Sequence, residues 1–234
     1  MKKSYMFTLL VFLILIPLTI YFGRSLSGKG YYLVAFAIIG ELLIPFFMTF
    51  ERSKPTAREL VMLAVMCAIA IISRVAIPIP NFKAIYAVIM LSGIAFGPER
   101  GFIVGAISAF ASNFFYGQGA YLPWQMLAYG AGGMLAGFVF NCKMLSKKAI
   151  SMAVFGFFAV VLFVGPILDS AHVFIMMPSL SMISVKASLL SGFPINVSQG
   201  VCTALVMFFF GEPMLEKLQR VKNKYGIAED ENGI

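Results

Sequence analysis

Long apolar runs constrain this chain more than any other feature. A helix needs about 20 largely apolar residues to cross the hydrocarbon core of a bilayer. We place apolar segments at residues 5–22, 31–50, 57–77, 84–97, 101–115, 122–141, 149–167 and 188–210. With 60% hydrophobic and 12% charged residues, the composition excludes an ordinary soluble domain. The sequence therefore predicts an all-α, polytopic membrane helix bundle.

The positive charges indicate an orientation for this bundle. The formal net charge is +8, and cytoplasmic loops of membrane proteins carry an excess of Lys and Arg. If the N-terminus is cytoplasmic, all but five of the 18 basic residues fall in inside segments. The five exceptions are Arg24, Lys29, Arg74, Lys83 and Lys186. We expect both termini in the cytoplasm and a multi-pass chain between them.

The chain divides into three parts. Residues 1–56 predict two N-terminal transmembrane helices, residues 57–215 a six-helix membrane core, and residues 216–234 a polar cytoplasmic tail that frays. The start, Met1-Lys2-Lys3 before an apolar run, also resembles a secretory signal. The run is about 18 residues long, whereas signal cores span about 7 to 15, which favours a retained helix.

Glycines are regularly spaced in the middle of the chain. Gly93, Gly97, Gly101 and Gly105 recur every four residues, a spacing that lets helix backbones approach closely. The run from Gly97 to Arg100 predicts a tight turn, so 84–97 and 101–115 form a helical hairpin. Gly133 and Gly137 repeat the spacing further on. Both internal packing and docking on another membrane subunit explain such rows.

No catalytic constellation is present in the sequence. The single histidine, His172, belongs to no zinc-protease motif, and no Gly-x-Ser-x-Gly elbow occurs. The run from Gly23 to Gly30 approaches a phosphate-binding loop, but no serine or threonine follows Lys29. We expect no catalytic residue, no metal and no cofactor. A membrane enzyme using Asp169, His172 and Lys186 is the weakest alternative, since no nucleophile is arranged with them.

Ionisable residues within or beside apolar segments are costly and often functional. Glu41 lies in the middle of its segment, where it serves either the structure or a proton site. A proton site would make the protein a self-sufficient ion-coupled secondary transporter of a small organic solute. Arg74 and Lys83 lie near one end of their segments, where they either reach the membrane surface or point into a cavity. Asp169 and His172 read as a solvated loop pair.

A candidate binding site surrounds the connection at 112–125, which combines aromatic rings, amides and glycines. Rings stack on flat ligands, amides give directional hydrogen bonds, and glycines let residues 116–125 move as a lid. We expect it to converge with the connection around Pro80 and with a stretch from Asp169 to Gln199. The predicted binding residues are Asn81, Lys83, Asn113, Phe115, Tyr116, Gln118, Tyr121, Trp124, Gln125 and Asn196. An interfacial aromatic belt is the alternative for Tyr121 and Trp124.

These motifs together resemble a known family. They are Ala57-Arg58-Glu59-Leu60, Pro80-Asn81-Phe82-Lys83, the run from Ser92 to Phe102, the run from Ser112 to Gly119, and Pro123-Trp124-Gln125-Met126. The pattern resembles the substrate-binding subunit, or S component, of energy-coupling factor (ECF) vitamin transporters. It is most similar to the cobalamin-specific members, and the resemblance covers residues 57 to 210.

The resemblance implies a function in vitamin uptake. It implies capture of cobalamin or a related corrinoid on the outer face of a bacterial cytoplasmic membrane, as part of an ABC-type importer. The partners would be a transmembrane coupling subunit and two cytoplasmic ATPase subunits, on which the S component reorients. Ala64 and Ala68 match the family's Ala-x-x-x-Ala docking motif. The two helices before residue 57 depart from the family pattern.

Overall fold

The structure, a computed structural model, describes residues 56–225 except 78, 120 and 177–181, together with isolated positions among the first 55. This part is helical with short turns and contains no strand, which confirms the all-α prediction for it. The predicted N-terminal helices lie, apart from those isolated positions, outside the described residues, as do residues 226–234. Two of the isolated positions touch, because the Thr19 hydroxyl donates a 2.5 Å hydrogen bond to Glu41.

The described helices follow the predicted segments closely up to residue 141. Their bounds are α4 (Ala57–Val75), α5 (Ile85–Phe96), α6 (Pro98–Tyr116), α7 (Leu122–Asn141), α8 (Ala149–Ala159), η2 (Val160–Val164), α9 (Gly165–Met176) and α10 (Met182–Tyr225). The π-helical turn η2 joins α8 to α9 without a break. Helix α10 extends beyond the predicted core into the region assigned to the polar tail.

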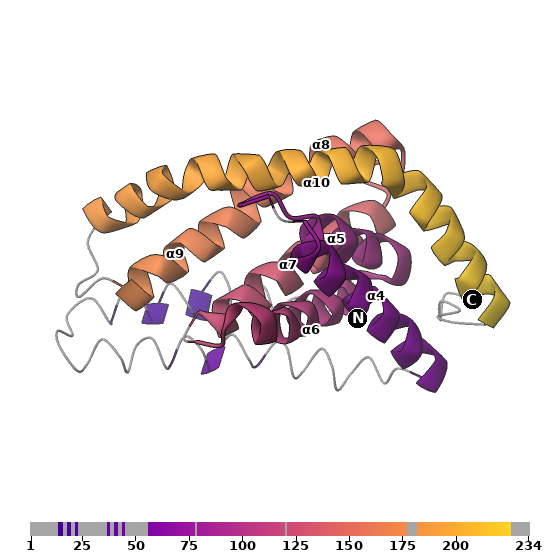
Figure 1. The fold of residues 1–234 in the computed structure, drawn as a ribbon, viewed down its shortest axis with the longest axis horizontal. Helices are drawn as coiled ribbons and strands as arrows, with labels where there is room; N and C mark the ends of the chain where they lie inside the picture. The colour runs from indigo at the N-terminus through magenta and orange to yellow at the C-terminus, as the bar shows by residue number, and fades with distance from the viewer. Residues whose placement is uncertain are drawn as a thin grey trace.

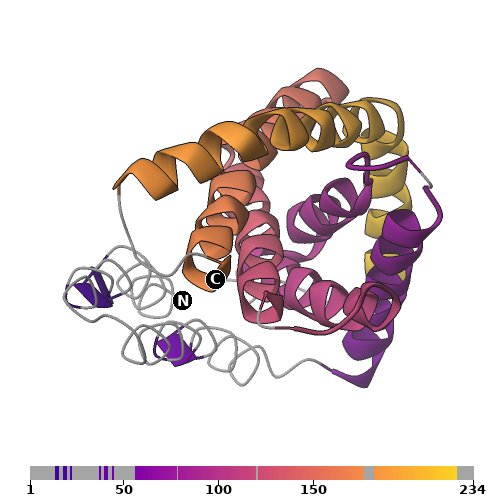
Figure 2. The same cartoon turned by 60° about the vertical axis from the view of Figure 1, so that its left-hand side comes forward.

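Helix α5 is the centre of the bundle. All of its residues except Ala95 are buried, as expected for a helix that is apolar on every side. It contacts α4, α6, α7, α8 and α10. Figure 1 shows α10 running along one side of the bundle, and Figure 2 shows α5 enclosed by the other helices. The other helices therefore pack around one short buried helix.

The glycine rows bring α5, α6 and α7 into backbone contact. A Cβ placed on Gly93 would lie 2.0 Å from the carbonyl O of Gly133, and one on Gly105 would lie 2.4 Å from the carbonyl O of Tyr129. A Cβ on Gly137 would lie 2.7 Å from Cα of Pro98. Real side chains do not approach this closely, so these positions exclude any residue with a Cβ. The rows serve internal packing, which settles the choice left open by the spacing.

The predicted hairpin between α5 and α6 turns at a single residue. Gly97 ends α5 and precedes α6 with φ of 101°, a backbone conformation that L side chains rarely adopt. Pro98 then starts α6, where the absence of its N–H costs nothing. The hairpin prediction is confirmed, with a shorter turn than the four residues expected.

An ion pair fastens the starts of α4 and α6 together. Glu59 is 4% exposed, accepts a hydrogen bond from the backbone N–H of Thr56 at 3.2 Å, and pairs with Arg100. Arg100 also donates to the carbonyl O of Phe96 at 3.0 Å. Two of the motifs that carry the family resemblance, around Glu59 and around Arg100, therefore meet at this end of the bundle.

The stretch from Asp169 to Gln199 is mostly helical, which corrects the expectation of an open connection there. Asp169 and His172 lie in α9, α10 begins at Met182, and residues 177–181 are outside the described part of the chain. The helices continue because their polar groups satisfy one another: Asn196 donates to Asp169 at 2.7 Å, and Ser188 donates to the carbonyl O of Asp169 at 2.8 Å. Pro194 sits inside α10 without ending it.

Two of the described helical stretches are long and apolar enough to cross a membrane. They are Ala149–Val173 and Met182–Tyr225, and Ile85–Phe96 is a shorter apolar helix. This agrees with a helical membrane protein, while the number of spans stays a prediction.

Because α6 and α7 are in close contact, one added methyl group between them should strongly reduce the stability of the fold. Gly133→Ala places a Cβ 2.4 Å from the carbonyl O of Gly101, so the two backbones must separate. We expect the free energy of unfolding to fall by about 2 kcal/mol or more. Denaturant unfolding of the detergent-solubilised protein, followed by circular dichroism, measures this.

The matched control is Gly119→Ala, whose Cβ meets nothing within 4 Å. Equal stability of Gly133→Ala and Gly119→Ala would contradict the packing described for α6 and α7.

Candidate functional site

Two adjoining cavities lie at the end of the bundle where α4 and α6 end. The first, here called the tyrosine cavity, has a volume of about 150 Å³. Its lining residues are Arg74, Asn81, Lys83, Tyr86, Tyr116, Tyr129 and Gln199. The second, here called the amide cavity, has a volume of about 330 Å³. It is lined by Arg74, Asn113, Tyr116, Gly117, Gln118, Gly119, Tyr121, Leu122 and Gln125. Arg74 and Tyr116 belong to both walls.

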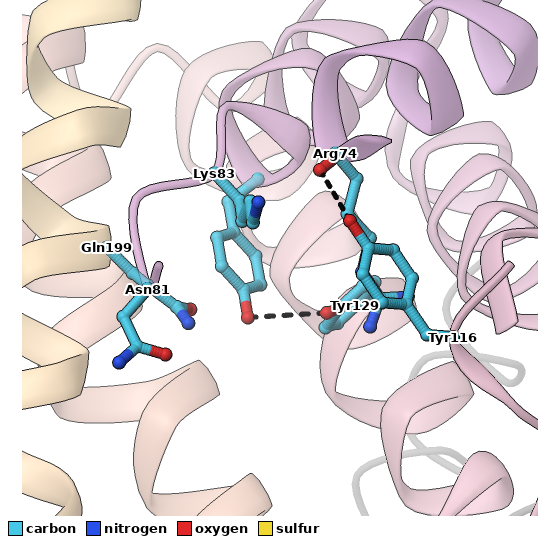
Figure 3. Close-up of a pocket in the computed structure, with 7 residues that line it drawn as sticks. Arg74, Asn81, Lys83, Tyr116, Tyr129 and Gln199 are labelled. Atoms are coloured by element: carbon cyan, nitrogen blue, oxygen red, sulfur yellow. Dashed lines mark hydrogen bonds between the residues drawn. The ribbon is translucent and has the colours of Figure 1, made fainter. Parts of the chain in front are cut away.

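Arg74 stands at the junction and is held from several sides. It lies in the last turn of α4, and its Nη1 donates to the Ser112 hydroxyl and, at 3.0 Å, to Oδ1 of Asn113. Its guanidinium carbon lies 4.7 Å from the centroid of the Tyr116 ring and 5.7 Å from that of Tyr129. The Tyr116 hydroxyl donates to the Arg74 carbonyl O at 3.0 Å (Figure 3). The cation is thus fixed in position rather than free to swing.

Two buried tyrosines form the floor of the tyrosine cavity. The rings of Tyr86 in α5 and Tyr129 in α7 meet edge to face, with centroids 4.9 Å apart. Their hydroxyl oxygens are 3.5 Å apart, as the dashed line in Figure 3 marks. These hydroxyls give an otherwise apolar pair of helices a polar tip that faces the cavity.

The turn between α4 and α5 supplies the opposite wall. Asn81 has φ of 56°, a left-handed conformation that asparagine tolerates better than most residues. Lys83 is partly buried, and its Nζ donates to the carbonyl O of Ile77 within the same turn. Figure 3 places Asn81 and Gln199 across the cavity from Arg74 and Tyr116. Residues from α4, α5, α6, α7 and α10 therefore contribute to one small space.

The amide cavity depends on the segment between α6 and α7. Asn113 donates to Oε1 of Gln125, which links the end of α6 to the start of α7. Gln118 donates to the carbonyl O of Phe110 at 3.3 Å, and Gly117 has φ of 101°. The Tyr121 hydroxyl donates to the carbonyl O of Leu168 at 2.9 Å, which ties the segment to α9. Burial raises the pKa of Tyr121, so its hydroxyl stays a neutral donor.

Comparison with known proteins assigns the family. Residues 54–215, most of the chain, match the family model of the ECF-type riboflavin transporter, S component. The chain belongs to this family. Searches of curated proteins and of solved structures found no match. The resemblance to ECF S components stated from the motifs is thus confirmed at the level of the family, and the chain is the substrate-binding subunit of a membrane transporter.

Most of the predicted binding residues of this S component come together on the two cavity walls. Asn81, Lys83, Asn113, Tyr116, Gln118, Tyr121 and Gln125 line one cavity or both. Three others lie elsewhere. Phe115 is 69% exposed, Trp124 is buried among the helices, and Asn196 is bonded to Asp169. None of the three lines either cavity.

Sequence reasoning missed the two tyrosines on the cavity floor and did not commit to Arg74 or Gln199. Tyr86 and Tyr129 each stand within a largely apolar segment, so they read as packing residues. A usable signal existed, because a buried tyrosine needs a partner for its hydroxyl and each segment carries one near the same end of the bundle. Arg74, which the sequence places either at the membrane surface or in a cavity, lies on a cavity wall.

The predicted docking residues lie on a face of α4 that is exposed in the described part of the chain. Ala64 and Ala68 are exposed, whereas the glycine rows are buried inside the bundle. Large apolar side chains share this face. They are Leu60, Val61, Val65, Ile69 and Ile72, each at least 40% exposed.

Proposed function

We propose that this S component captures a flat, aromatic vitamin of about flavin size in the joined tyrosine and amide cavities. The observation that carries the proposal is the meeting of the two cavities at Arg74 and Tyr116. Tyrosine faces suit stacking on a planar ring, and the amides of Asn113, Gln118 and Gln125 suit hydrogen bonds to its polar edge. Small-molecule sites commonly combine such apolar walls with a few directed polar groups.

The cavity size favours a compact vitamin over cobalamin. The amide cavity, at about 330 Å³, is at the lower end of the range for ligand sites, and the tyrosine cavity, at about 150 Å³, is below that range. A corrin macrocycle with its appended nucleotide is several times larger than a tricyclic ring with a short side chain. The description of the matching family names riboflavin, which makes the isoalloxazine ring the first candidate.

Transport itself requires partners. ECF S components work with a module of ATPase and transmembrane subunits. We infer that this chain lies in the membrane with the cavities facing outward and the Glu59–Arg100 end facing the cytoplasm, as the distribution of basic residues suggests. The exposed face of α4 around Ala64 and Ala68 would then contact the coupling subunit. Reorientation on that subunit, with two ATPases supplying the energy, would deliver the ligand inward.

The ligand proposal predicts a selective titration. Purified protein should bind riboflavin and fail to retain cobalamin, as read by quenching of flavin fluorescence and by equilibrium dialysis. Tyr116→Ala should weaken flavin binding by about 1–3 kcal/mol, because it removes the ring shared by both cavities. The adjacent Phe115→Ala, which removes an exposed ring from outside the cavities, should not.

Tight binding of cobalamin without riboflavin would overturn the ligand while leaving the transporter class intact. Equal losses in Tyr116→Ala and Phe115→Ala would remove the site from these cavities.

The docking proposal predicts a loss of assembly without a loss of binding. Ala64→Trp or Ala68→Trp fills a face where helices approach closely, so co-purification with the coupling subunit should fail. Ligand affinity should be unchanged, since neither residue lines a cavity. Ala187→Trp, which replaces an exposed alanine on α10, is the control. Intact co-purification of both α4 variants would place the interface elsewhere.

A further inference from the structure

The described residues that line the tyrosine cavity include two cationic side chains and no acid. Arg74 and Lys83 both line it, and no aspartate or glutamate among the described residues lines either cavity. Neither cation has a carboxylate of the described residues within ion-pair distance, in contrast to Arg100 at the other end of the bundle. Two cations that line one small cavity without a counter-charge among the described residues are unfavourable in a site of low dielectric, so the arrangement favours binding of an anion.

The neighbouring acid does not neutralise this pair. Asp169 is bonded by the amide of Asn196 in the contact of α9 with α10, and it does not line the cavity. Tyr86, Tyr116 and Tyr129 are neutral phenols that stabilise a cation only through their ring faces or oxygen atoms. The positive charge of the cavity is therefore not compensated by the described side chains around it.

Arg74 also has N–H groups that are not engaged by described residues. Its hydrogen bonds to Ser112 and Asn113 both leave from Nη1, so Nε and Nη2 donate to no described residue. The guanidinium is nevertheless immobilised by those bonds and by the Tyr116 ring. A guanidinium group that is already ordered binds a carboxylate or phosphate with little further loss of conformational entropy. Lys83 supplies a second point charge to the same cavity from the turn between α4 and α5.

The geometry points to an anion subsite formed by Arg74 and Lys83, so that the preferred ligand carries an acidic group, carboxylate or phosphate, beside its flat ring. This inference rests on the proposed function for the ring and adds to it the charge of the ligand. Riboflavin itself is neutral, whereas its 5′-phosphate and the acidic members of other small ring vitamins are not. The subsite would make the protein select an acid form over its neutral counterpart.

The test compares neutral and acidic partners that share one ring. Riboflavin is paired with riboflavin 5′-phosphate, pyridoxal with pyridoxal 5′-phosphate, and nicotinamide with nicotinate, each titrated into the full-length protein in a neutral detergent. In at least one pair the acidic member should bind about tenfold or more tightly, and the preference should decrease with added salt. The phosphate and carboxylate pairs show which acidic group the subsite takes.

Variants then assign the preference to the cavity. Lys83→Gln should reduce the preference for the acidic member over the neutral one about tenfold, and Lys83→Arg should restore the preference. Lys186→Gln, which removes an exposed lysine of α10 away from both cavities, should change nothing.

The outcomes separate this inference from the proposed function. Equal or tighter binding of riboflavin than of its phosphate, with no acid preference in the other pairs, would overturn the anion subsite and leave a flavin-type site standing. If the acidic members of the pyridoxal and nicotinamide pairs bind more tightly and no flavin binds, the anion subsite stands and the proposal of a flavin-sized ligand is overturned. Failure of every acidic member to bind, or a preference unaffected by Lys83→Gln, would overturn the subsite.

Discussion

The contact of backbone with backbone among α5, α6 and α7 is the constraint on which the rest of the structure depends. In a membrane, helices gain no hydrophobic free energy by leaving lipid for one another, so close van der Waals packing must hold them together. The glycines at 93, 101, 105, 133 and 137 permit that closeness, since a Cβ at any of them would overlap a neighbouring backbone. The site inherits its geometry from this packing, because Tyr86 on α5 and Tyr129 on α7 can meet only when their helices are this close.

The polar groups of the bundle are divided between structure and site. Glu59 forms an ion pair with Arg100, and Asp169 accepts a hydrogen bond from Asn196. Both pairs lie in contacts between helices and serve the structure. Arg74 and Lys83 differ, because their partners are neutral oxygens and their charges stay uncompensated by described acids. Buried or half-buried charge without a counter-charge is costly, and such residues in membrane proteins usually mark a pathway or a binding site. The two ends of the bundle are thus chemically distinct, with one closed by an ion pair and the other hollow and cationic.

Periodicity and turn chemistry made much of the fold predictable. The segments at 57–77, 84–97 and 122–141 correspond closely to α4, α5 and α7, and the proline after Gly97 marked the hairpin. The prediction was wrong between Asp169 and Gln199, because polar residues and Pro194 suggested an interrupted chain there. A hydrogen bond between polar side chains of two helices, such as that of Asn196 to Asp169, allows both helices to continue through polar residues. Such a pairing cannot be recognised in a single sequence.

The candidate site was only partly visible before the structure. Amides and tyrosines in the 112–125 connection stood out by composition, and Asn113, Tyr116, Gln118, Tyr121 and Gln125 do line a cavity. Phe115 and Trp124 share that connection, yet one faces outward and the other packs inward. Which way a ring points depends on helix phase at the end of α6 and the start of α7, and a shift of one residue turns it by about 100° around the helix axis. Tyr86 and Tyr129 were not predicted as site residues, because the sequence around each is largely apolar and indicates a packing role.

A structure of the protein with the small molecule that co-purifies with it tests the central claim most directly. The predicted result is a flat ring against Tyr116 and Tyr129, with its polar edge near Asn113 and Gln125 and its acidic group between Arg74 and Lys83. A ligand bound outside the two cavities, against the exposed face of Phe115 or between lipid-facing helices, would contradict it.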